Sequence, residues 1–146
     1  MSNTKQLKII RGLPGSGKST YVKKNYPEAM VCSADDYFEE LAAFNNTSYL
    51  EEFKPWLVMN AHQQCWSDFI RAVVVMDEPL VVVDNTNTTF DEYRNYVFLA
   101  KEMGYEVEIV EIPFDSDLTK AHIYHERNTH GVPLKVIQDM MSRYEN

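Results

Sequence analysis

The stretch GLPGSGKST, which extends from Gly12 to Thr20, decides how the rest of the chain is interpreted. It matches the pattern G-x-x-x-x-G-K-[ST] at every fixed position. Glycines let the backbone of such a loop form a concave nest whose N–H groups point at phosphate oxygens. The stretch therefore predicts a phosphate-binding loop, and the residues expected to bind nucleotide are Gly12, Pro14, Gly15, Ser16, Gly17, Lys18, Ser19 and Thr20.

The residues on either side of this loop have the pattern that the motif requires. Residues 7–11 predict a short strand, and residues 19–25 predict a helix that ends before Pro27. A helix that starts here adds the positive end of its dipole to the phosphate site. Lys18 would then contact the β- and γ-phosphates, and the Ser19 hydroxyl would bind Mg²⁺. We therefore expect ATP and Mg²⁺ as cofactors. ATP is expected rather than GTP because the sequence has no Asn/Thr-Lys-x-Asp guanine signature.

The chain has 146 residues, of which 45% are hydrophobic and 25% are charged, as in an ordinary globular domain. This length suits one domain, which we expect to span residues 1–146. The sequence has neither a membrane-spanning run nor the apolar core of a signal peptide, so we expect a cytoplasmic protein with no membrane partner. Cys32 and Cys65 lie in runs that we expect to be buried, which predicts free thiols in the core. No protein partner is evident from the sequence.

The charge of the chain limits its nucleic-acid partners. The formal net charge is −8 and the pI is about 4.9. Proteins that wrap long nucleic acids neutralise many phosphates with Lys and Arg, so this balance argues against that function. It is compatible with a short nucleic-acid end that enters a locally positive cleft.

Runs typical of strands and helices alternate along the chain, which predicts an α/β fold with a parallel sheet covered by helices. The expected strands are residues 7–11, 29–33, 80–83 and 105–112. The expected helices are residues 19–25, 35–43, 51–75, 91–103, 117–128 and 134–144. In the segment 51–75, the apolar spacing predicts one long helix with Pro55 in its first turn and with Trp56 and Met59 on its apolar face.

Carboxylates follow two of the expected strands. Asp84 comes at the end of an apolar strand, where it could help to hold Mg²⁺ or could simply cap the strand. Asp35 and Asp36 follow the second strand, where one could accept a proton from a hydroxyl during phosphoryl transfer or both could cap a helix. The carboxyl ends of parallel strands lie at one edge of the sheet, so we expect these groups to lie near the glycine loop.

Arg127 is expected near the end of a helix, just before the polar loop 129–133. An Arg on a mobile segment could close over the phosphates and offset the charge of the transition state. The alternative is a cation that stabilises the C-terminus of a helix. The neighbouring Asn128, Thr129 and Gly131 favour a flexible lid.

Taken together, five motifs in order resemble the kinase domain of the polynucleotide 5′-kinase family and its small AAA-type ATPase relatives. They are GLPGSGKST at residues 12–20, SADDY at 33–37, VVDNTN at 82–87, Arg127-Asn128, and GVP at 131–133. The resemblance implies a P-loop NTPase fold, a three-layer α/β/α sandwich with a four-stranded parallel sheet in the order 2-3-1-4.

The resemblance also assigns expected roles to individual residues. It implies that Asp35 is the general base toward the acceptor hydroxyl and that Lys18 and Arg127 act on the phosphates. It implies that Ser19 binds Mg²⁺ and that Asp84 supports the acceptor side. The acceptor-binding residues that we expect are Asp35, Phe38, Asp84 and Asn87.

Two positions depart from the family pattern. Phe38 stands where the best known members have an Arg that grips the 3′-phosphate of the acceptor. A second lid Arg has no clear match, and His130 stands nearby. Phe38 and the neighbouring Tyr37 and Phe44 could instead stack on a base or line an apolar pocket.

The sequence thus predicts an ATP-dependent phosphotransferase whose acceptor is a 5′-hydroxyl of a nucleic-acid end or a nucleotide. The departure at Phe38 and the net charge of −8 support an alternative, a small-metabolite or nucleoside kinase of the same fold. A third possibility is a nucleotide-binding switch or adaptor without transfer activity.

Overall fold

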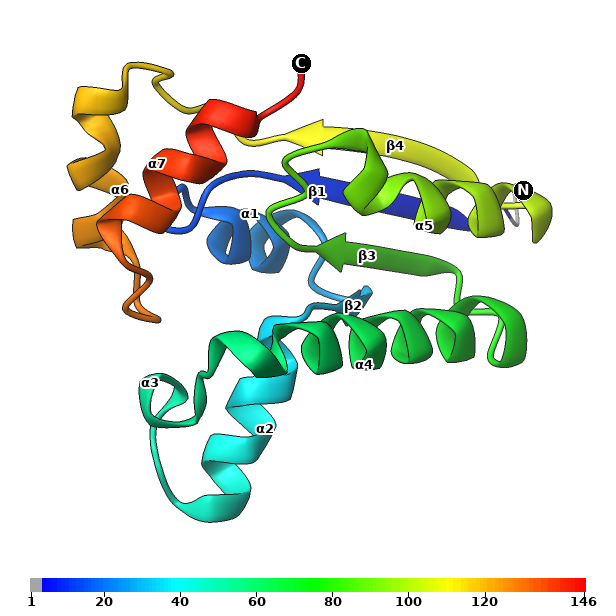
Figure 1. The fold of residues 1–146 in the computed structure, drawn as a ribbon. Coiled ribbons are helices and arrows are strands. Elements are labelled where there is room, and N and C mark those ends of the chain that lie inside the picture. Colours follow the sequence, from blue (N-terminus) through cyan, green and yellow to red (C-terminus); the bar gives the residue numbers. More distant parts are fainter. Residues whose placement is uncertain (1–3) are drawn as a thin grey trace.

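The structure is a computed structural model that describes residues 4–146. Its centre is a parallel sheet of four strands in the order β2-β3-β1-β4 (Figure 1). The predicted α/β fold and strand order are confirmed. The strands are β1 (Gln6–Arg11), β2 (Met30–Cys32), β3 (Leu80–Asp84) and β4 (Glu106–Glu111).

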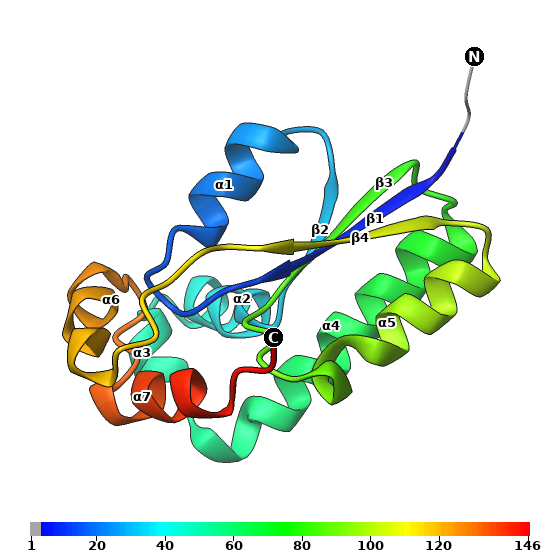
Figure 2. The ribbon, with the colours of Figure 1, turned by 90° about the horizontal axis from the view of Figure 1, so that it is seen from above.

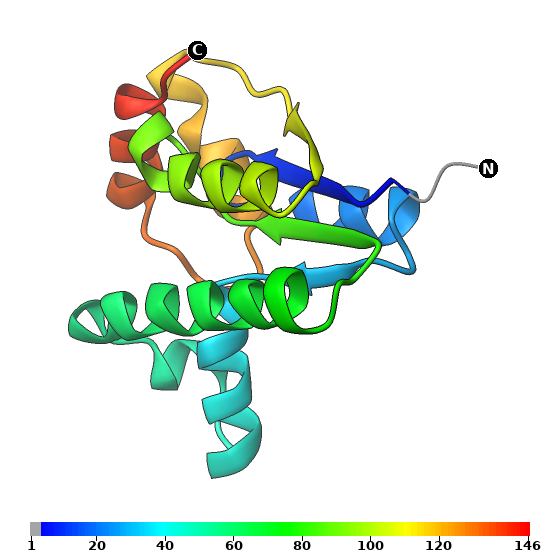
Figure 3. The same ribbon diagram turned by 90° about the vertical axis from the view of Figure 1, so that its right-hand side faces the viewer.

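Helices cover both faces of the sheet and its carboxyl edge. One face carries α1, whereas α4 and α5 lie on the other face (Figure 2). The remaining helices gather at the end toward which the strands point (Figures 1 and 3). The helices are α1 (Lys18–Asn25), α2 (Asp35–Asn45), α3 (Tyr49–Glu52), α4 (Val58–Ile70), α5 (Phe90–Glu102), α6 (Ala121–Arg127) and α7 (Leu134–Arg143).

The two central strands are buried on both faces, as expected for a parallel sheet. Alternate residues of a strand point to opposite faces, so β1 and β3 contribute to two apolar clusters. Ile9 and Val83 pack with Phe69 on the α4–α5 side. Ile10 packs with Val22 on the α1 side. The glycine loop between β1 and α1 is therefore anchored at both of its ends.

The segment predicted as one long helix, residues 51–75, is instead divided. Lys54 has an extended backbone (φ −135°, ψ 132°), which is the usual conformation of a residue before proline. Consequently α3 ends at Glu52, Pro55 begins a short 3₁₀ turn, and α4 begins only at Val58. Trp56 and Met59, predicted on the buried face, are 73% and 68% exposed.

Arg11, the last residue of β1, is a buried cation at the edge of the sheet. Its guanidinium donates to the carbonyl oxygens of Asn87 (2.7 Å) and Thr88 (2.9 Å) in the loop after β3. It also donates to the carbonyl oxygen of Glu145 (2.5 Å) and pairs with Glu111 (2.6 Å). One side chain thus connects β1, β4, the loop after β3 and the C-terminal tail.

Cys32 and Cys65 are buried free thiols, as predicted. Burial raises the pKa of Cys32 to about 12, so this thiol stays protonated and unreactive. Among residues 4–146, no helix has both the length and the apolar character needed to cross a bilayer.

Candidate nucleotide-binding and phosphotransfer site

The glycine loop connects β1 directly to α1, and its conformation requires two of its glycines. Gly15 has a φ of 76°, and Gly17, the N-cap of α1, has a φ of 98°. Side chains other than glycine rarely adopt this region. Because α1 begins at Lys18, the backbone N–H groups of its first turn lie at the loop. This arrangement suits the binding of phosphate oxygens.

The loop also packs tightly against α6. A Cβ atom on Gly15 would lie 2.1 Å from the carbonyl oxygen of Tyr124 and 3.1 Å from the amide nitrogen of Asn128. The absence of a side chain therefore lets the C-terminal end of α6, which carries Arg127, approach the phosphate-binding loop.

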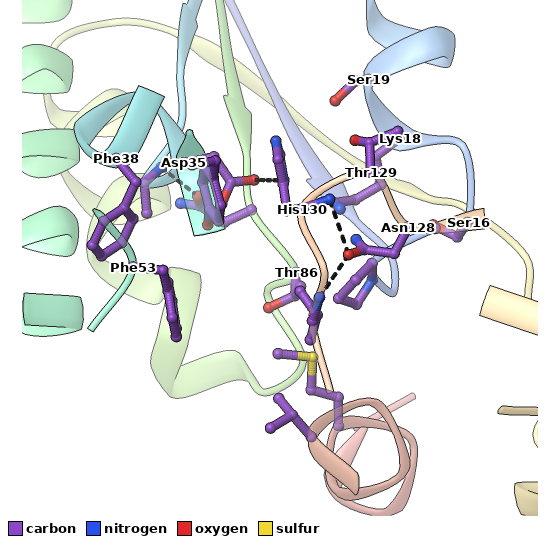
Figure 4. A pocket seen from close by; sticks show the side chains of 18 of the residues that line it. Ser16, Lys18, Ser19, Asp35, Phe38, Phe53, Thr86, Asn128, Thr129 and His130 are labelled. Atoms are coloured by element: carbon purple, nitrogen blue, oxygen red, sulfur yellow. Dashed lines mark hydrogen bonds and ion pairs between the residues drawn. The ribbon is translucent and has the colours of Figure 1, made fainter. Parts of the chain in front are cut away.

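A cavity with a volume of about 570 Å³ opens beside this loop (Figure 4). In Figure 4, Phe38 and Phe53 lie on one side, Lys18 and Ser19 lie on the other, and Asp35 and His130 lie between them. The pocket brings together these predicted site residues: Pro14, Gly15, Ser16, Gly17, Lys18, Ser19, Thr20, Asp35, Phe38 and Arg127.

Asp84 is 8% exposed at the end of β3, beside the start of α1. Burial raises the pKa of its carboxyl group, while the charge of Lys18 and a hydrogen bond with the Ser19 side chain oppose this shift. A hydroxyl and a carboxylate so close together are oxygen ligands of the kind that Mg²⁺ uses when substrate phosphates complete its shell. Residues 4–146 contain no group of three or more His, Cys, Asp and Glu side chains that could hold a metal by themselves.

Asp35 is the first residue of α2, and its side chain faces the pocket. The Tyr49 hydroxyl donates a hydrogen bond of 2.7 Å to Asp35 Oδ1. The other carboxylate oxygen, Oδ2, lies 3.6 Å from Nδ1 of His130. The cap of α2 is Ala34, without a side-chain hydrogen bond, so Asp35 is not the capping residue.

The predicted loop after α6 forms one wall of the pocket, and a single side chain shapes it. Asn128 Oδ1 accepts hydrogen bonds from the backbone N–H groups of His130 (3.1 Å) and Val132 (2.8 Å). Arg127 is exposed and lines the pocket. Its guanidinium has no hydrogen bond or ion pair with any residue of the described range 4–146. We call residues 128–132 the lid loop.

The predicted acceptor residues have different surroundings. Phe38 is 2% exposed and lines the pocket as part of an aromatic cluster with Tyr49 and Phe53, at ring distances of 5.5 Å and 5.0 Å. Phe44 is 88% exposed and lies outside the pocket.

The expectation that Asn87 contacts the acceptor is corrected by the structure. Asn87 is 2% exposed and does not line the pocket. Its side chain donates instead to the carbonyl oxygen of Ile10 (2.8 Å), which fixes the loop after β3 against β1. The residues of that loop which reach the pocket are Asn85 and Thr86.

Tyr49 and the contacts of His130 were not found by sequence reasoning. Tyr49 follows Asp35 by 14 residues and reaches it only because α3 folds back on α2. His130 Nε2 lies 3.0 Å from Glu39, which is 91 residues earlier in the chain. No local sequence pattern predicts contacts between residues so far apart in the chain.

The sequence of this chain matches known proteins along almost its whole length. A family model described as "AAA domain" matches residues 7–146. NEDD4-binding protein 2 of Homo sapiens is 30% identical over 95% of this chain, and YLP motif-containing protein 1 of Homo sapiens is 27% identical over 94%. The chain spans only 8% and 7% of the length of these two proteins.

Two solved structures extend the comparison to the fold. A chain of the Pnkp1/Rnl/Hen1 RNA repair complex superposes with a TM-score of 0.68 and 17% identity, covering 99% of this chain and 45% of that chain. A gluconokinase from Sinorhizobium meliloti 1021 superposes with a TM-score of 0.54 and 14% identity, covering 100% of this chain and 78% of that chain. With the family match over residues 7–146, these findings establish that the chain belongs to the AAA domain family and has the fold of the P-loop kinases.

Proposed function

We propose that this protein is an ATP-dependent phosphotransferase that moves the γ-phosphoryl group to a hydroxyl, namely the 5′-hydroxyl of a nucleic-acid end or a nucleotide. One observation carries the proposal. Lys18 of the phosphate-binding loop and the carboxylate of Asp35 line the same pocket, with Asp35 between Lys18 and the aromatic side chains of Phe38 and Phe53. A nucleotide-binding switch would need the first of these groups but has no use for the second.

The roles of the residues follow from their positions. The loop amides and Lys18 hold the phosphates of ATP, and Arg127, at the end of α6 beside the loop, offsets their charge. Ser19 and Asp84 would hold Mg²⁺, which supplies charge neutralisation on the phosphate oxygens when bound. Asp35 accepts the proton of the acceptor hydroxyl. The acceptor oxygen then forms a bond to the γ-phosphorus as the bond to the β–γ bridging oxygen breaks, and ADP leaves.

A second candidate acceptor is a small hydroxyl compound, and the lining of the pocket favours it. Lys18 and Arg127 are the only Lys and Arg among the lining residues, and both lie beside the phosphate-binding loop. The far wall is built from aromatic and aliphatic side chains, including Phe38, Phe53 and Val58. The neighbours support both candidates, since one belongs to an RNA repair complex and another is a gluconokinase.

The test is a transfer assay with ATP labelled on the γ-phosphate. The acceptors are a 5′-hydroxyl oligonucleotide, the same oligonucleotide with a 5′-phosphate as the matched control, nucleosides and polyols. Label on the 5′-hydroxyl oligonucleotide alone supports the first candidate, and label on a nucleoside or polyol supports the second. ATP binding without any labelled acceptor would contradict transfer and would support a nucleotide-binding switch.

A further inference from the structure

The Asp35 carboxylate is held by a residue that does not belong to the phosphate-binding machinery. Tyr49 lies at the start of α3 and donates its hydroxyl proton to Asp35 Oδ1 over 2.7 Å. Burial and the charge of Asp35 raise the pKa of the Tyr49 hydroxyl far above its usual range. The hydroxyl therefore remains protonated and acts only as a donor in this contact.

The same tyrosine contacts the lid loop. Its ring stacks on the imidazole of His130, with a centroid distance of 4.0 Å and an interplanar angle of 17°. His130 Nδ1 is 3.6 Å from Asp35 Oδ2, beyond hydrogen-bonding distance, and Nε2 is 3.0 Å from Glu39. Asp35 thus has one oxygen held by Tyr49 and one oxygen without a hydrogen bond to any described residue.

We propose that Tyr49 is a positioning residue for Asp35: its hydroxyl fixes Oδ1, so that Oδ2 accepts the proton of the acceptor hydroxyl. This inference rests on the proposed role of Asp35 as the base. The carboxylate of an Asp rotates easily about its last torsion angle, because that rotation has a broad energy profile. A donor on one oxygen restricts the rotation, and a base held in one orientation spends more time aligned for transfer.

The stack with His130 connects this positioning to the lid loop. The ring of Tyr49 packs against His130 of the lid loop, and its hydroxyl donates to Asp35. The lid loop therefore contacts the same side chain that holds the carboxylate of Asp35, the proposed base.

The test replaces only the hydroxyl. Tyr49→Phe keeps the ring, its stack on His130 and its contacts with Phe38 and Phe53, and it removes the hydrogen bond to Asp35. We expect kcat for phosphoryl transfer to fall about tenfold or more, with an unchanged KM for ATP. Tyr37→Phe is the matched control, since Tyr37 lies on the same helix as Asp35, is not among the residues that line this pocket and has no hydroxyl hydrogen bond within residues 4–146.

The double variant Asp35→Asn/Tyr49→Phe separates positioning from a general structural role. If Tyr49 acts through Asp35, its replacement causes no further loss of transfer when Asp35 is already Asn. An equal loss in both backgrounds would overturn the proposal, and so would a Tyr49→Phe variant with wild-type kcat.

A second readout needs no turnover. The NMR resonance of the Asp35 carboxyl carbon is expected to move in Tyr49→Phe and to stay in place in Tyr37→Phe. If the wild-type protein labels no acceptor, the proposed function is contradicted. The Asp35 resonance in Tyr49→Phe would still show whether the Tyr49 hydroxyl contacts the Asp35 carboxylate. An unchanged resonance in Tyr49→Phe would refute that contact whatever the activity.

Discussion

At the scale of single residues, two adjacent carboxyl groups have different environments. Asp35 faces the pocket and has the Tyr49 hydroxyl as a donor. Asp36 is half-buried behind it, and its pKa is raised to about 6 by burial first and then by the charges of Glu39, Glu40 and Asp35. Of the Asp-Asp pair, only the first residue lines the pocket, and the charged form of the second is destabilised by burial and by neighbouring carboxylates.

Replacing Asp36 therefore changes how stability depends on pH. The folded chain binds the Asp36 proton more tightly than the unfolded chain, whose carboxyl has a pKa near 3.8. The tighter binding of this proton stabilises the folded chain. The stabilisation is fully present below pH 3.8, where the carboxyl is protonated in both states, and it is lost as the pH rises through about 6. Asp36→Asn stays neutral, so at pH 7.5 we expect it to be more stable than wild type by about 1 kcal/mol, a value discounted for solvent screening.

Urea unfolding at pH 4 and pH 7.5 measures this effect. Glu28→Gln, an exposed acid between α1 and β2, is the control that removes the same charge without the burial. If Asp36→Asn raised the unfolding free energy by the same amount at both pH values, the result would be incompatible with the raised pKa of Asp36.

Gly15 gives a second prediction at this scale. Gly15→Ala places a methyl group 2.1 Å from the Tyr124 carbonyl oxygen and also requires a φ of 76°. Gly104→Ala is the matched control, because its φ is 83° but the new methyl group meets no atom within 4 Å. We expect Gly104→Ala to cost about 1–2 kcal/mol of unfolding free energy from backbone strain alone. Gly15→Ala should cost more and should also weaken ATP binding, and similar losses in both variants would argue against the tight packing of α6 on the loop.

At the scale of elements, the lid loop depends on one side chain. Asn128→Ala removes the acceptor of two backbone hydrogen bonds, each of which contributes about 1 kcal/mol. We expect the amide hydrogens of His130 and Val132 to exchange with solvent roughly tenfold faster or more. Asn128→Asp keeps an acceptor oxygen and should preserve most of the protection. Unchanged exchange in Asn128→Ala would mean that other contacts hold the lid loop.

The elements differ in how well the sequence predicts them. The glycine loop and the two central strands were predictable because each depends on local features: a complete motif for the loop, the uninterrupted apolar run 80–83 for β3, and the short, mostly apolar run directly before the motif for β1. The break at Lys54 was missed because the apolar spacing continues across Pro55, although the residue before a proline is restricted. Tyr49 was missed because its role arises only from the way in which α3 folds back toward Asp35.

The prediction for Asn87 shows a related difficulty. The side-chain amide of an Asn in a polar turn after a strand can face a ligand or can form hydrogen bonds with the backbone. The same sequence pattern is found in both cases, so the pattern does not distinguish them. In the structure, Asn87 satisfies the carbonyl oxygen of Ile10, and its own carbonyl oxygen accepts from Arg11. Asn87, which we expected to contact the acceptor, thus holds the edge of the sheet together.

At the scale of the whole molecule, Arg11 joins segments that are distant in the sequence. Its side chain is 3% exposed and connects β1 with β4, with the loop after β3 and with the C-terminal tail. Arg11→Met leaves buried carbonyl acceptors without a donor, so we expect a loss of about 3 kcal/mol in unfolding free energy.

Lys8→Met is the control for Arg11→Met. Lys8 also lies on β1 and pairs with a glutamate of β4, Glu108, whose side chain is 59% exposed. Solvent screens such a pair, and its loss should cost at most about 1 kcal/mol. Equal losses in the two variants, measured by urea unfolding, would contradict the stabilising role assigned to Arg11.

We propose that a phosphate-binding loop and a base share one pocket and together transfer a phosphoryl group. The most direct measurement compares wild type and Asp35→Asn, both for ATP affinity and for the rate of labelling of the acceptor found in the panel. In Asp35→Asn we expect unchanged ATP affinity and a transfer rate that falls by about a hundredfold or more, because the proton acceptor is lost. A variant that binds ATP and transfers at the wild-type rate would contradict this proposal.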